Sequence, residues 1–365
     1  MRKSSRDQPA SAPRRRTLAD LARELGVDTS TISLALRDSP KVSAGMKAKI
    51  RALASKRRYV PNAHARALAG GRSALLGVIL PCSGIPFYSM MLDLLYEQAA
   101  KRSLRVEAQF HQWDEKLEAS SFRTMTAHRA EGIVSFSPPM NPLGEFQEDL
   151  FSDTGIPTSF WGPLPKGLPN PSGALRGFVT VNVRKGARMA AEHLLGLGHR
   201  RIALMPYHRG SWLSREARSG IEEAMQLHPG AELVPVSLPK TFSTEAVGAE
   251  KTFAGGLCVA GEFLRLDPLP TAAITTDDTH AHVLMSALAS RGLRVPENLS
   301  VVCSGNTYYA RYGAVPLSCV SMPLAEIAEK LVALVTEPTG DNPASEHVFQ
   351  PEFIPRMSTA VLTAK

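Results

Sequence analysis

The segment from residue 17 to residue 72 constrains the fold more than any other, because its apolar residues are spaced as a series of short helices. Four of them recur at i, i+3, i+4 and i+7, the spacing of one helix face: Leu18, Leu21, Ala22 and Leu25. Thr17 followed by Asp20 has the spacing of a capping box, and Gly26 can supply the left-handed residue that ends a helix. The pattern predicts a helix over residues 18–25.

A second short helix is predicted over residues 29–37, with Asp28 as its N-cap. Its inward-facing positions are apolar: Ile32, Ala35 and Leu36. Its outward-facing positions are mostly small and polar: Thr29, Ser30, Ser33 and Leu34. Two short helices joined by a glycine-containing turn form the helix-turn-helix pattern, in which the second helix lies in the major groove of DNA.

A third helix is predicted over residues 44–57, capped by Ser43. Its apolar residues are expected to cover the first two helices: Met46, Ile50, Leu53 and Ala54. Its basic residues are expected to stay exposed, where they can contact phosphate: Lys47, Lys49, Arg51, Lys56 and Arg57.

A short hinge helix is predicted after the head. Pro61 suits a first helical turn, residues 63–69 have high helix propensity, and two glycines follow. A helix of this length is marginal in water, so we expect it to form on DNA. Leu68 would then enter a minor-groove base step, with Asn62 and Ala65 on the same face.

The positive charge of the chain is concentrated in this region. Residues 1–72 contain 17 lysines and arginines and 5 acidic residues, whereas the remainder contains 25 and 29, so a head of +12 and a body of −4 make the total of +8. A solvated basic surface would give the same charge. Together with the helix-turn-helix spacing, however, the asymmetry favours a nucleic-acid-binding module.

Residues 1–15 are predicted to form a disordered basic arm. Two interpretations of the adjoining run Arg14, Arg15 and Arg16 stay open: contacts to phosphate or a minor groove, or a tail that only aids solubility.

The four cysteines show no paired metal-ligand spacing: Cys82, Cys258, Cys303 and Cys319. Reduced thiols in a cytoplasmic protein are therefore expected, with no metal site and no cofactor. The N-terminus lacks the apolar segment of a signal peptide, and no stretch approaches the roughly 18 apolar residues that span a bilayer. These features argue against export and against a membrane partner.

The rest of the chain alternates predicted strands with helical segments, which indicates parallel α/β sheets. The predicted strands are 75–81, 105–110, 132–137, 156–161, 178–183, 201–205, 233–238, 271–276, 299–304 and 317–322, with closing strands around 347–350 and 358–363. Two such sets predict an α/β body of two doubly wound lobes. Ligands of these folds bind beyond the carboxyl ends of the strands, so the cleft between the lobes is the expected pocket.

Several stretches in order carry a family resemblance: TLADLARELGVDTSTISLAL, LLGVILP, GARMAAEHLLGLGHRRIALM, PTAAITTDD and PEFIPRMSTAVL. From Thr17 nearly to the end, the chain resembles the LacI/GalR family of bacterial transcription regulators. The resemblance implies a transcription regulator, most often a repressor. It also implies a homodimer whose heads and hinge helices bind near-palindromic double-stranded operator DNA, and a body resembling a periplasmic binding protein.

The implied organisation has four parts. Residues 1–15 form the basic arm, and residues 16–60 form the all-α helix-turn-helix head. Residues 61–74 form the hinge helix and linker, and residues 75–365 form the effector-binding and dimerisation domain. The chain is expected to cross between lobes near Val181, Met322 and His347. Lobe 1 then comprises about 75–180 and 322–346, and lobe 2 about 181–321 and 347–365.

Expected DNA contacts come from the head and the hinge: Thr17, Asp28, Thr29, Ser30, Thr31, Ser33, Leu34, Tyr59, Asn62, Ala65 and Leu68. Leu34 stands where relatives with a Ser-Arg pair have arginine. It can contact a thymine methyl but cannot donate to guanine. Packing of Leu34 on the hinge or the third helix is the alternative.

The resemblance also implies effector contacts from both lobes: Phe87, Tyr88, Arg209, Ser211, Arg215, Phe242 and Asp277. Phe87 and Tyr88 match aromatic residues that stack on a base in purine-type relatives, with core packing as the alternative. Arg215 matches an arginine that pairs with ligand oxygens, and Asp277 stands where sugar-binding members usually have asparagine.

Two positions depart from the family pattern. Gly162 and Gly305 stand where carboxylates are common, and their absence disfavours a free sugar or an ordinary purine. A less polar pocket could use Trp161, Trp212 and Phe242. Arg209 and Ser211 match ligand contacts of purine-type relatives, although an exposed loop would look the same.

Two other functions are alternatives to a regulator controlled by an effector. The chain has no G-x-S-x-G elbow, Walker loop or G-x-G-x-x-G after its first strand, which argues against an enzyme. Its scattered histidines His193, His199 and His208 are interpreted as helix-end or loop residues. The second alternative is a DNA-binding regulator without an effector, whose body serves only for dimerisation.

Overall fold

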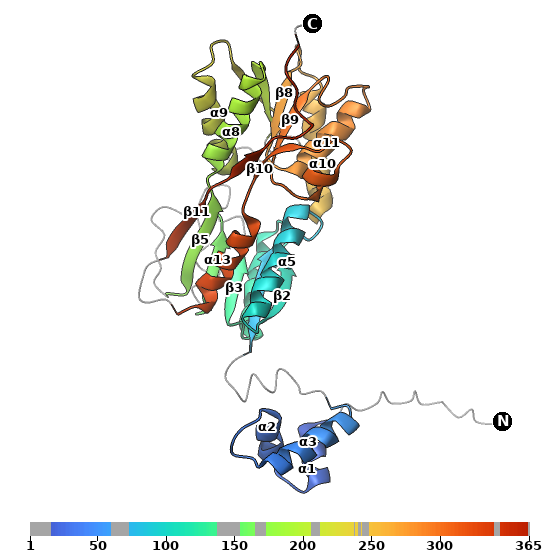
Figure 1. The fold of residues 1–365 in the computed structure, drawn as a ribbon, viewed down its shortest axis with the longest axis vertical. Helices are drawn as coiled ribbons and strands as arrows, with labels where there is room; N and C mark the ends of the chain where they lie inside the picture. The colour runs from blue at the N-terminus through green and yellow to red at the C-terminus, as the bar shows by residue number, and fades with distance from the viewer. Residues whose placement is uncertain are drawn as a thin grey trace, which may run out of the picture. The chain divides into compact units, whose positions relative to one another are not determined.

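The computed structural model comprises two compact units, residues 1–73 and 74–365 (Figure 1). It describes residues 16–59, 73–136, 154–164, 173–205, 212–236, 238–239, 242, 248–338 and 344–363. The predicted basic arm and hinge helix, with Asn62, Ala65 and Leu68, lie outside these residues, as do Arg209 and Ser211.

The head contains the three predicted helices: α1 (Leu18–Leu25), α2 (Thr29–Leu36) and α3 (Ala44–Lys56). Thr17 and Asp20 form the capping box of α1, and Gly26 closes this helix in the left-handed region at φ 65°. The side chain of Asp28 accepts from the backbone N–H of Ser30 at 2.7 Å, and Ser43 caps α3. The three predicted helices and their caps are therefore confirmed.

The core of the head lies where these helices meet. Leu21, Ile32 and Ile50, one from each helix, are fully buried. Burial of a leucine or isoleucine side chain is worth about 1.5–3 kcal/mol, so these three positions hold the helices together.

The first lobe of the body is built on a parallel sheet with the order β11-β5-β4-β3-β1-β2. Its strands are β1 (Leu75–Leu80), β2 (Arg105–Phe110), β3 (Gly132–Ser135), β4 (Thr158–Trp161), β5 (Leu175–Val181) and β11 (Ser345–Phe349). Helices α5 (Pro86–Lys101) and α13 (Leu324–Thr336) pack on one face, and α6 (Glu115–Ala127) packs on the other. Every residue of β1 is buried, as its continuous apolar run predicts.

The second lobe repeats this plan with the sheet order β12-β10-β9-β8-β6-β7. Its strands are β6 (Arg201–Met205), β7 (Glu232–Pro235), β8 (Ala272–Thr275), β9 (Ser300–Ser304), β10 (Ser318–Ser321) and the antiparallel β12 (Glu352–Ile354). Helices α8 (Val183–Gly196) and α9 (Trp212–Met225) lie on one side, whereas α10 (Gly248–Phe263) and α11 (Asp278–Ala289) pack on the other (Figure 1). The predicted two-lobed α/β body is confirmed.

The chain crosses between the lobes after β5, after β10 and after β11. The last crossing comes later than expected, because His347 pairs with Val179 inside the first sheet and the strand continues to Phe349. The backbone N–H of Asn182 donates to the carbonyl oxygen of Phe349 at 2.9 Å, which holds the first and third crossings together.

The closing segment also differs from its prediction. Residues 358–363 form no strand, and the closing strand of the second lobe is β12 instead. The Ser358 carbonyl accepts from the N–H of Val301 at 2.8 Å, and its hydroxyl accepts from the N–H of Ser318 at the same distance. Val361 is 68% exposed, so the apolar residues that suggested a strand do not enter the core.

In each sheet the direction in which strands are added reverses at the strand that comes first in the chain, β1 or β6. β1 lies between β2 and β3, and β6 lies between β7 and β8. At such a point the loops after neighbouring strands diverge and leave a crevice beyond the carboxyl ends. Among the helices that the structure describes, none is long and apolar enough to cross a membrane.

Gly220→Ala is expected to destabilise the body by about 1–3 kcal/mol or more, because α8 and α9 approach closely at this position. An added Cβ would lie 2.0 Å from the carbonyl oxygen of Arg184. Gly261→Ala in α10 is the matched control, since a Cβ there meets nothing within 4 Å and alanine is favoured inside helices by about 1 kcal/mol. Denaturant unfolding should separate the two variants; equal midpoints would contradict this packing.

Candidate DNA-recognition surface and inter-lobe site

The outer face of α2 is small and polar near its N-terminus. Thr29 and Ser30 are exposed, and Thr31 and Ser33 are half-buried. Hydrogen bonds from Ser30 hold the pKa of the Asp28 carboxyl below its ordinary value, so this N-cap is an anion next to hydroxyl groups. The helix offers hydroxyl donors and acceptors without bulk, which suits close approach to base edges.

Leu34 and Tyr59 are partly used in packing. Both are half-buried against the core of the head. The backbone N–H of Tyr59 also donates to the carbonyl oxygen of Ala54 at 2.8 Å, which fixes the chain just after α3. The structure thus places part of the Leu34 side chain inside the head, and its contact with DNA stays a prediction.

Three of the five basic residues expected to be exposed on α3 form ion pairs within the head. Lys47 and Arg51 lie 3.1 and 2.9 Å from the same carboxylate oxygen of Asp38. The side chain of Lys47 is only 17% exposed, so the expectation of an exposed side chain is wrong for this residue. Lys49 and Lys56 are exposed and form no ion pair with the residues that the structure describes.

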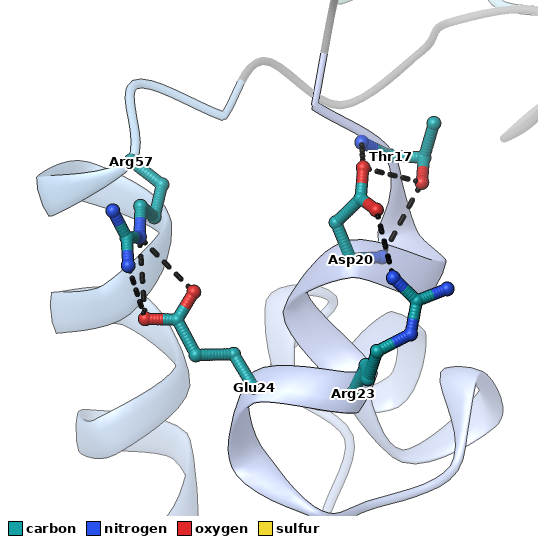
Figure 2. A network of polar contacts seen from close by, with 5 residues as sticks. All are labelled: Thr17, Asp20, Arg23, Glu24 and Arg57. Atoms are coloured by element: carbon teal, nitrogen blue, oxygen red, sulfur yellow. Dashed lines mark hydrogen bonds and ion pairs between the residues drawn. The ribbon is translucent and has the colours of Figure 1, made fainter.

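Arg57 is the third paired residue. Its Nη2 donates to Glu24 at 2.7 Å and its Nε at 3.0 Å, a fork that joins α1 to the end of α3 (Figure 2). The hydrogen bond from Arg57 lowers the pKa of Glu24. Arg23 of α1 pairs with Asp20 of the capping box at 3.6 Å (Figure 2).

One exposed cation at the end of α2 was not predicted from the sequence. Arg37 follows Ser33 by four residues, and its Nη2 donates to the Ser33 hydroxyl at 2.7 Å. The i, i+4 spacing is the signal that could have placed both residues on one face.

Five aromatic rings gather at the carboxyl edge of the first sheet; we call them the aromatic cluster: Phe87, Tyr88, Trp113, Phe136 and Trp161. Phe87 and Tyr88 come from the first turn of α5, and the other three follow or end strands β2, β3 and β4. Neighbouring ring centroids are 5.2 to 6.3 Å apart, the range of edge-to-face and stacked pairs. Trp113 and Phe136 were not predicted, although each follows a strand at the same edge.

The titratable groups in and next to the aromatic cluster, Tyr88 and His111, are neutral. Burial raises the pKa of the Tyr88 hydroxyl, with smaller effects from Cys82 and Asp277. His111, which is 1% exposed and lies beside Trp113, has its pKa lowered by burial to about 4. The carboxyl edge of the first sheet therefore combines apolar rings with uncharged hydrogen-bonding groups.

Asp277 lies at the facing edge of the second sheet, where it caps α11. Its Oδ1 accepts from the backbone N–H of His280 at 2.7 Å, and its Oδ2 lies 2.5 Å from His280 Nδ1. Burial alone would raise the pKa of Asp277, but the charge and hydrogen bonds of His280 outweigh it and lower that pKa. Asp277 raises the pKa of His280 in turn, so the two form an ion pair.

The adjacent Asp278 has the opposite character. Burial raises its pKa to about 6, although its Oδ2 accepts from the backbone N–H of Thr307 at 2.8 Å. Gly305 has a left-handed φ of 92°, and an added Cβ there would lie 3.6 Å from this oxygen. An aspartate or glutamate at position 305 would therefore strain the backbone and add a second carboxylate beside Asp278.

The two lobes touch through the residues that follow β1. Ser89 Oγ lies 3.3 Å from the hydroxyl of Tyr308, and Gly84 is so close to α10 that an added Cβ would lie 2.6 Å from the Cβ of Ala249. Ser89 and Gly84 flank Phe87 and Tyr88, so the aromatic cluster lies beside the contact between the lobes.

The structure gathers only some of the predicted effector residues. Phe87 and Tyr88 join the aromatic cluster, and Asp277 of the second lobe makes a small contribution to the raised pKa of the Tyr88 hydroxyl. Arg215 is exposed in the first turn of α9, and Phe242 is half-buried beyond β7; neither belongs to the cluster. Within the described parts of the chain no set of three or more His, Cys, Asp or Glu side chains could hold a metal ion.

Residues 17–62 match the family described as bacterial regulatory proteins, lacI family, and residues 191–359 match a periplasmic binding protein-like domain. The chain is 27% identical over 351 residues to the HTH-type transcriptional regulator DegA of Bacillus subtilis, covering 95% of this chain and 98% of that protein. It is 25% identical over 353 residues to the HTH-type transcriptional repressor PurR of Vibrio cholerae, with coverage of 95% and 99%.

Solved structures share the fold. The lac repressor dimer bound to operator and the anti-inducer ONPF aligns with a TM-score of 0.74 at 20% identity, covering 95% of this chain and 100% of that chain. The transcriptional regulator CelR in complex with cellobiose aligns with a TM-score of 0.63 at 20% identity, with coverage of 94% and 100%.

The helix-turn-helix head, the two-lobed body and the relatives together define a DNA-binding transcription regulator with a periplasmic-binding-protein-like body. Residues 17–62 are a lacI-family helix-turn-helix domain, and residues 191–359 are a periplasmic-binding-protein-like domain.

Asp278→Asn is expected to stabilise the body relative to the wild type, and increasingly so as the pH rises from about 4 to about 7. The folded-state pKa of about 6 lies above the ordinary value, so the folded wild type holds a proton that the unfolded chain has lost, and its stability falls through this window. Asparagine does not titrate, so the variant lacks this pH dependence of stability. Its side-chain oxygen can still accept from the backbone N–H of Thr307. At about 1.4 kcal/mol per pKa unit the gain is roughly 1–3 kcal/mol. Urea unfolding across this range measures it; a pH-independent difference would contradict the raised pKa.

Proposed function

We propose that this protein is a sequence-specific repressor that binds operator DNA as a homodimer in the cytoplasm and responds to a small molecule held between its lobes. The observation that carries the proposal is the capped helix α2, with its small polar outer face, inside a head that matches the lacI family. Relatives named as transcriptional regulators and repressors support a regulator rather than an enzyme.

Operator binding as a dimer rests on geometry. One helix of eight residues reaches only a few base pairs, so specificity needs two heads on half-sites one helical turn apart or a multiple of it. The similar fold of the lac repressor dimer, which was solved on its operator, supports this arrangement. In the proposal, the contacts of the head are joined by Asn62, Ala65 and Leu68 of the hinge.

The proposed effector lies between the aromatic cluster and Asp277. Phe87 and Tyr88 supply an apolar surface from one lobe, and Asp277 supplies a carboxylate from the other. A ligand that touches both lobes binds the closed state more tightly, and only such a difference in affinity can alter the DNA-binding state. Arg215, Phe242, Arg209 and Ser211 complete the proposed set.

The chemistry of this site favours a ligand with an apolar or aromatic face. Gly162 and Gly305 offer no carboxylate for sugar hydroxyls, and both have a positive φ, 145° and 92°. The same two glycines favour the second candidate, a regulator without an effector whose body only dimerises. A ligand screen distinguishes the two.

Binding of the full-length protein to its operator is expected to weaken steeply with salt, because each neutralised phosphate releases counterions. A dimer that makes about 6–10 phosphate contacts loses roughly 10³- to 10⁵-fold in affinity between about 50 and 200 mM salt. Fluorescence anisotropy with a selected operator measures the slope of log K against log salt. A flat slope, or saturation at one protomer per operator, would refute dimeric operator binding.

A metabolite that shifts the melting temperature of the wild type is expected to lose its effect in Tyr88→Ala and Asp277→Asn, while ligand-free operator affinity stays within a few fold. Asparagine caps a helix about as well as aspartate, so Asp277→Asn removes the charge and keeps α11. Glu297→Gln is the matched control, because Glu297 is exposed and precedes β9 at the opposite edge of the sheet. If no metabolite alters the wild type, the effector-free alternative holds.

A further inference from the structure

Arg37 is the one long cationic side chain carried by the outer face of α2. At about 100° per residue it lies about 40° around the helix from Ser33 and about 20° from Ser30. Leu34 lies about 60° away towards the edge of this face. Arg37 is exposed at the C-cap of the helix, so the middle of the predicted recognition surface belongs to a guanidinium rather than to leucine.

The side chain of Arg37 is held along the helix rather than extended into solvent. Its Nη2 donates to the Ser33 hydroxyl at 2.7 Å and its Nε donates to the Ser33 carbonyl oxygen at 3.4 Å. Helical side chains lean towards the N-terminus of their helix, and the N-terminal part of a recognition helix meets the base edges. The bond to Ser33 therefore directs the guanidinium towards the part of the groove where bases are read.

The remaining donors of Arg37 have the geometry of a fork. A guanidinium has five N–H groups, and Ser33 occupies the edge formed by Nε and Nη2. The outer edge, formed by Nη1 and the second N–H of Nη2, contacts no acceptor among the residues that the structure describes. Two parallel N–H groups match O6 and N7 of guanine, the commonest specific contact of arginine in the major groove.

The surroundings of Arg37 leave this fork available. The next residue, Asp38, has a left-handed φ of 59°, and its carboxylate is engaged by Lys47 at 3.1 Å and Arg51 at 2.9 Å. Leu34 packs against the core of the head and has no donor. Arg37 thus supplies the guanidinium donors that Leu34 lacks.

We propose that Arg37, positioned by Ser33, donates two hydrogen bonds to a guanine in each half-site of the operator. The inference rests on the proposed function, because it requires sequence-specific binding to DNA. It adds a residue that reads a base to the predicted contacts of the head, and it names the base.

Selection from randomised duplexes by the full-length protein, followed by anisotropy titrations, tests the proposal. The wild-type consensus is expected to contain a guanine in each half-site that Arg37→Ala no longer selects. Arg37→Ala should bind the wild-type operator roughly 5- to 150-fold more weakly, the loss of one bidentate contact. Arg37→Lys keeps the charge but not the fork, so it should lose the same guanine preference.

Lys49→Ala is the matched control for lost charge, since Lys49 is exposed on α3. It should keep the wild-type consensus. Ser33→Ala should weaken the guanine preference without removing a charge, and Ser33→Thr, which keeps the hydroxyl, should restore it. Thermal unfolding of each variant checks that the head stays folded.

Two results overturn the proposal. An unchanged consensus for Arg37→Ala with a salt slope reduced by about one places Arg37 on a phosphate. Unchanged consensus, affinity and slope place it away from DNA. In both cases wild-type selection still succeeds, whereas a wild type that selects no sequence refutes the proposed function as well.

Discussion

The body depends on one property of parallel sheets: all strands end at the same edge. Because β1 pairs with both β2 and β3 in parallel register, the residues that follow these strands become neighbours. Phe87, Trp113 and Phe136 are far apart in sequence, and this constraint alone brings their rings together. The same rule in the second sheet sets Asp277 and Thr307 beyond β8 and β9. The topology therefore gathers these side chains at the carboxyl edges of the two sheets, where the proposed effector site lies.

Two adjacent carboxylates show how strongly the local environment governs that site. Asp277 at the start of α11 is paired with His280 and has a lowered pKa, whereas the buried Asp278 has a pKa of about 6. Asp277 therefore stays charged near the Tyr88 hydroxyl, and Asp278 changes its charge close to neutral pH. The charge of these two carboxylates is set by burial and partners rather than by residue type.

Some of the charged side chains of the head form ion pairs with one another. Glu24 with Arg57, and Asp38 with Lys47 and Arg51, connect neighbouring segments on the surface of the head. Exposed pairs of this kind contribute about 0–1 kcal/mol each, so they orient side chains more than they stabilise the fold. The net charge of the segment therefore overstates how many cations can meet phosphate, and the exposed lysines outside these pairs, Lys49 and Lys56, gain importance.

The sequence by itself determined the three helices of the head, their caps and the two-lobed plan, because caps and periodicity depend on residues within a few positions of one another. Only the tertiary structure decided that β11 pairs with β5 in the first sheet and that residues 358–363 form no strand, since strand pairing joins distant segments. Tertiary packing likewise turned Leu34 partly inward, engaged Lys47 with Asp38 and added Trp113 to the aromatic cluster. Burial and ion pairing depend on what the rest of the chain places nearby, and no local pattern records it.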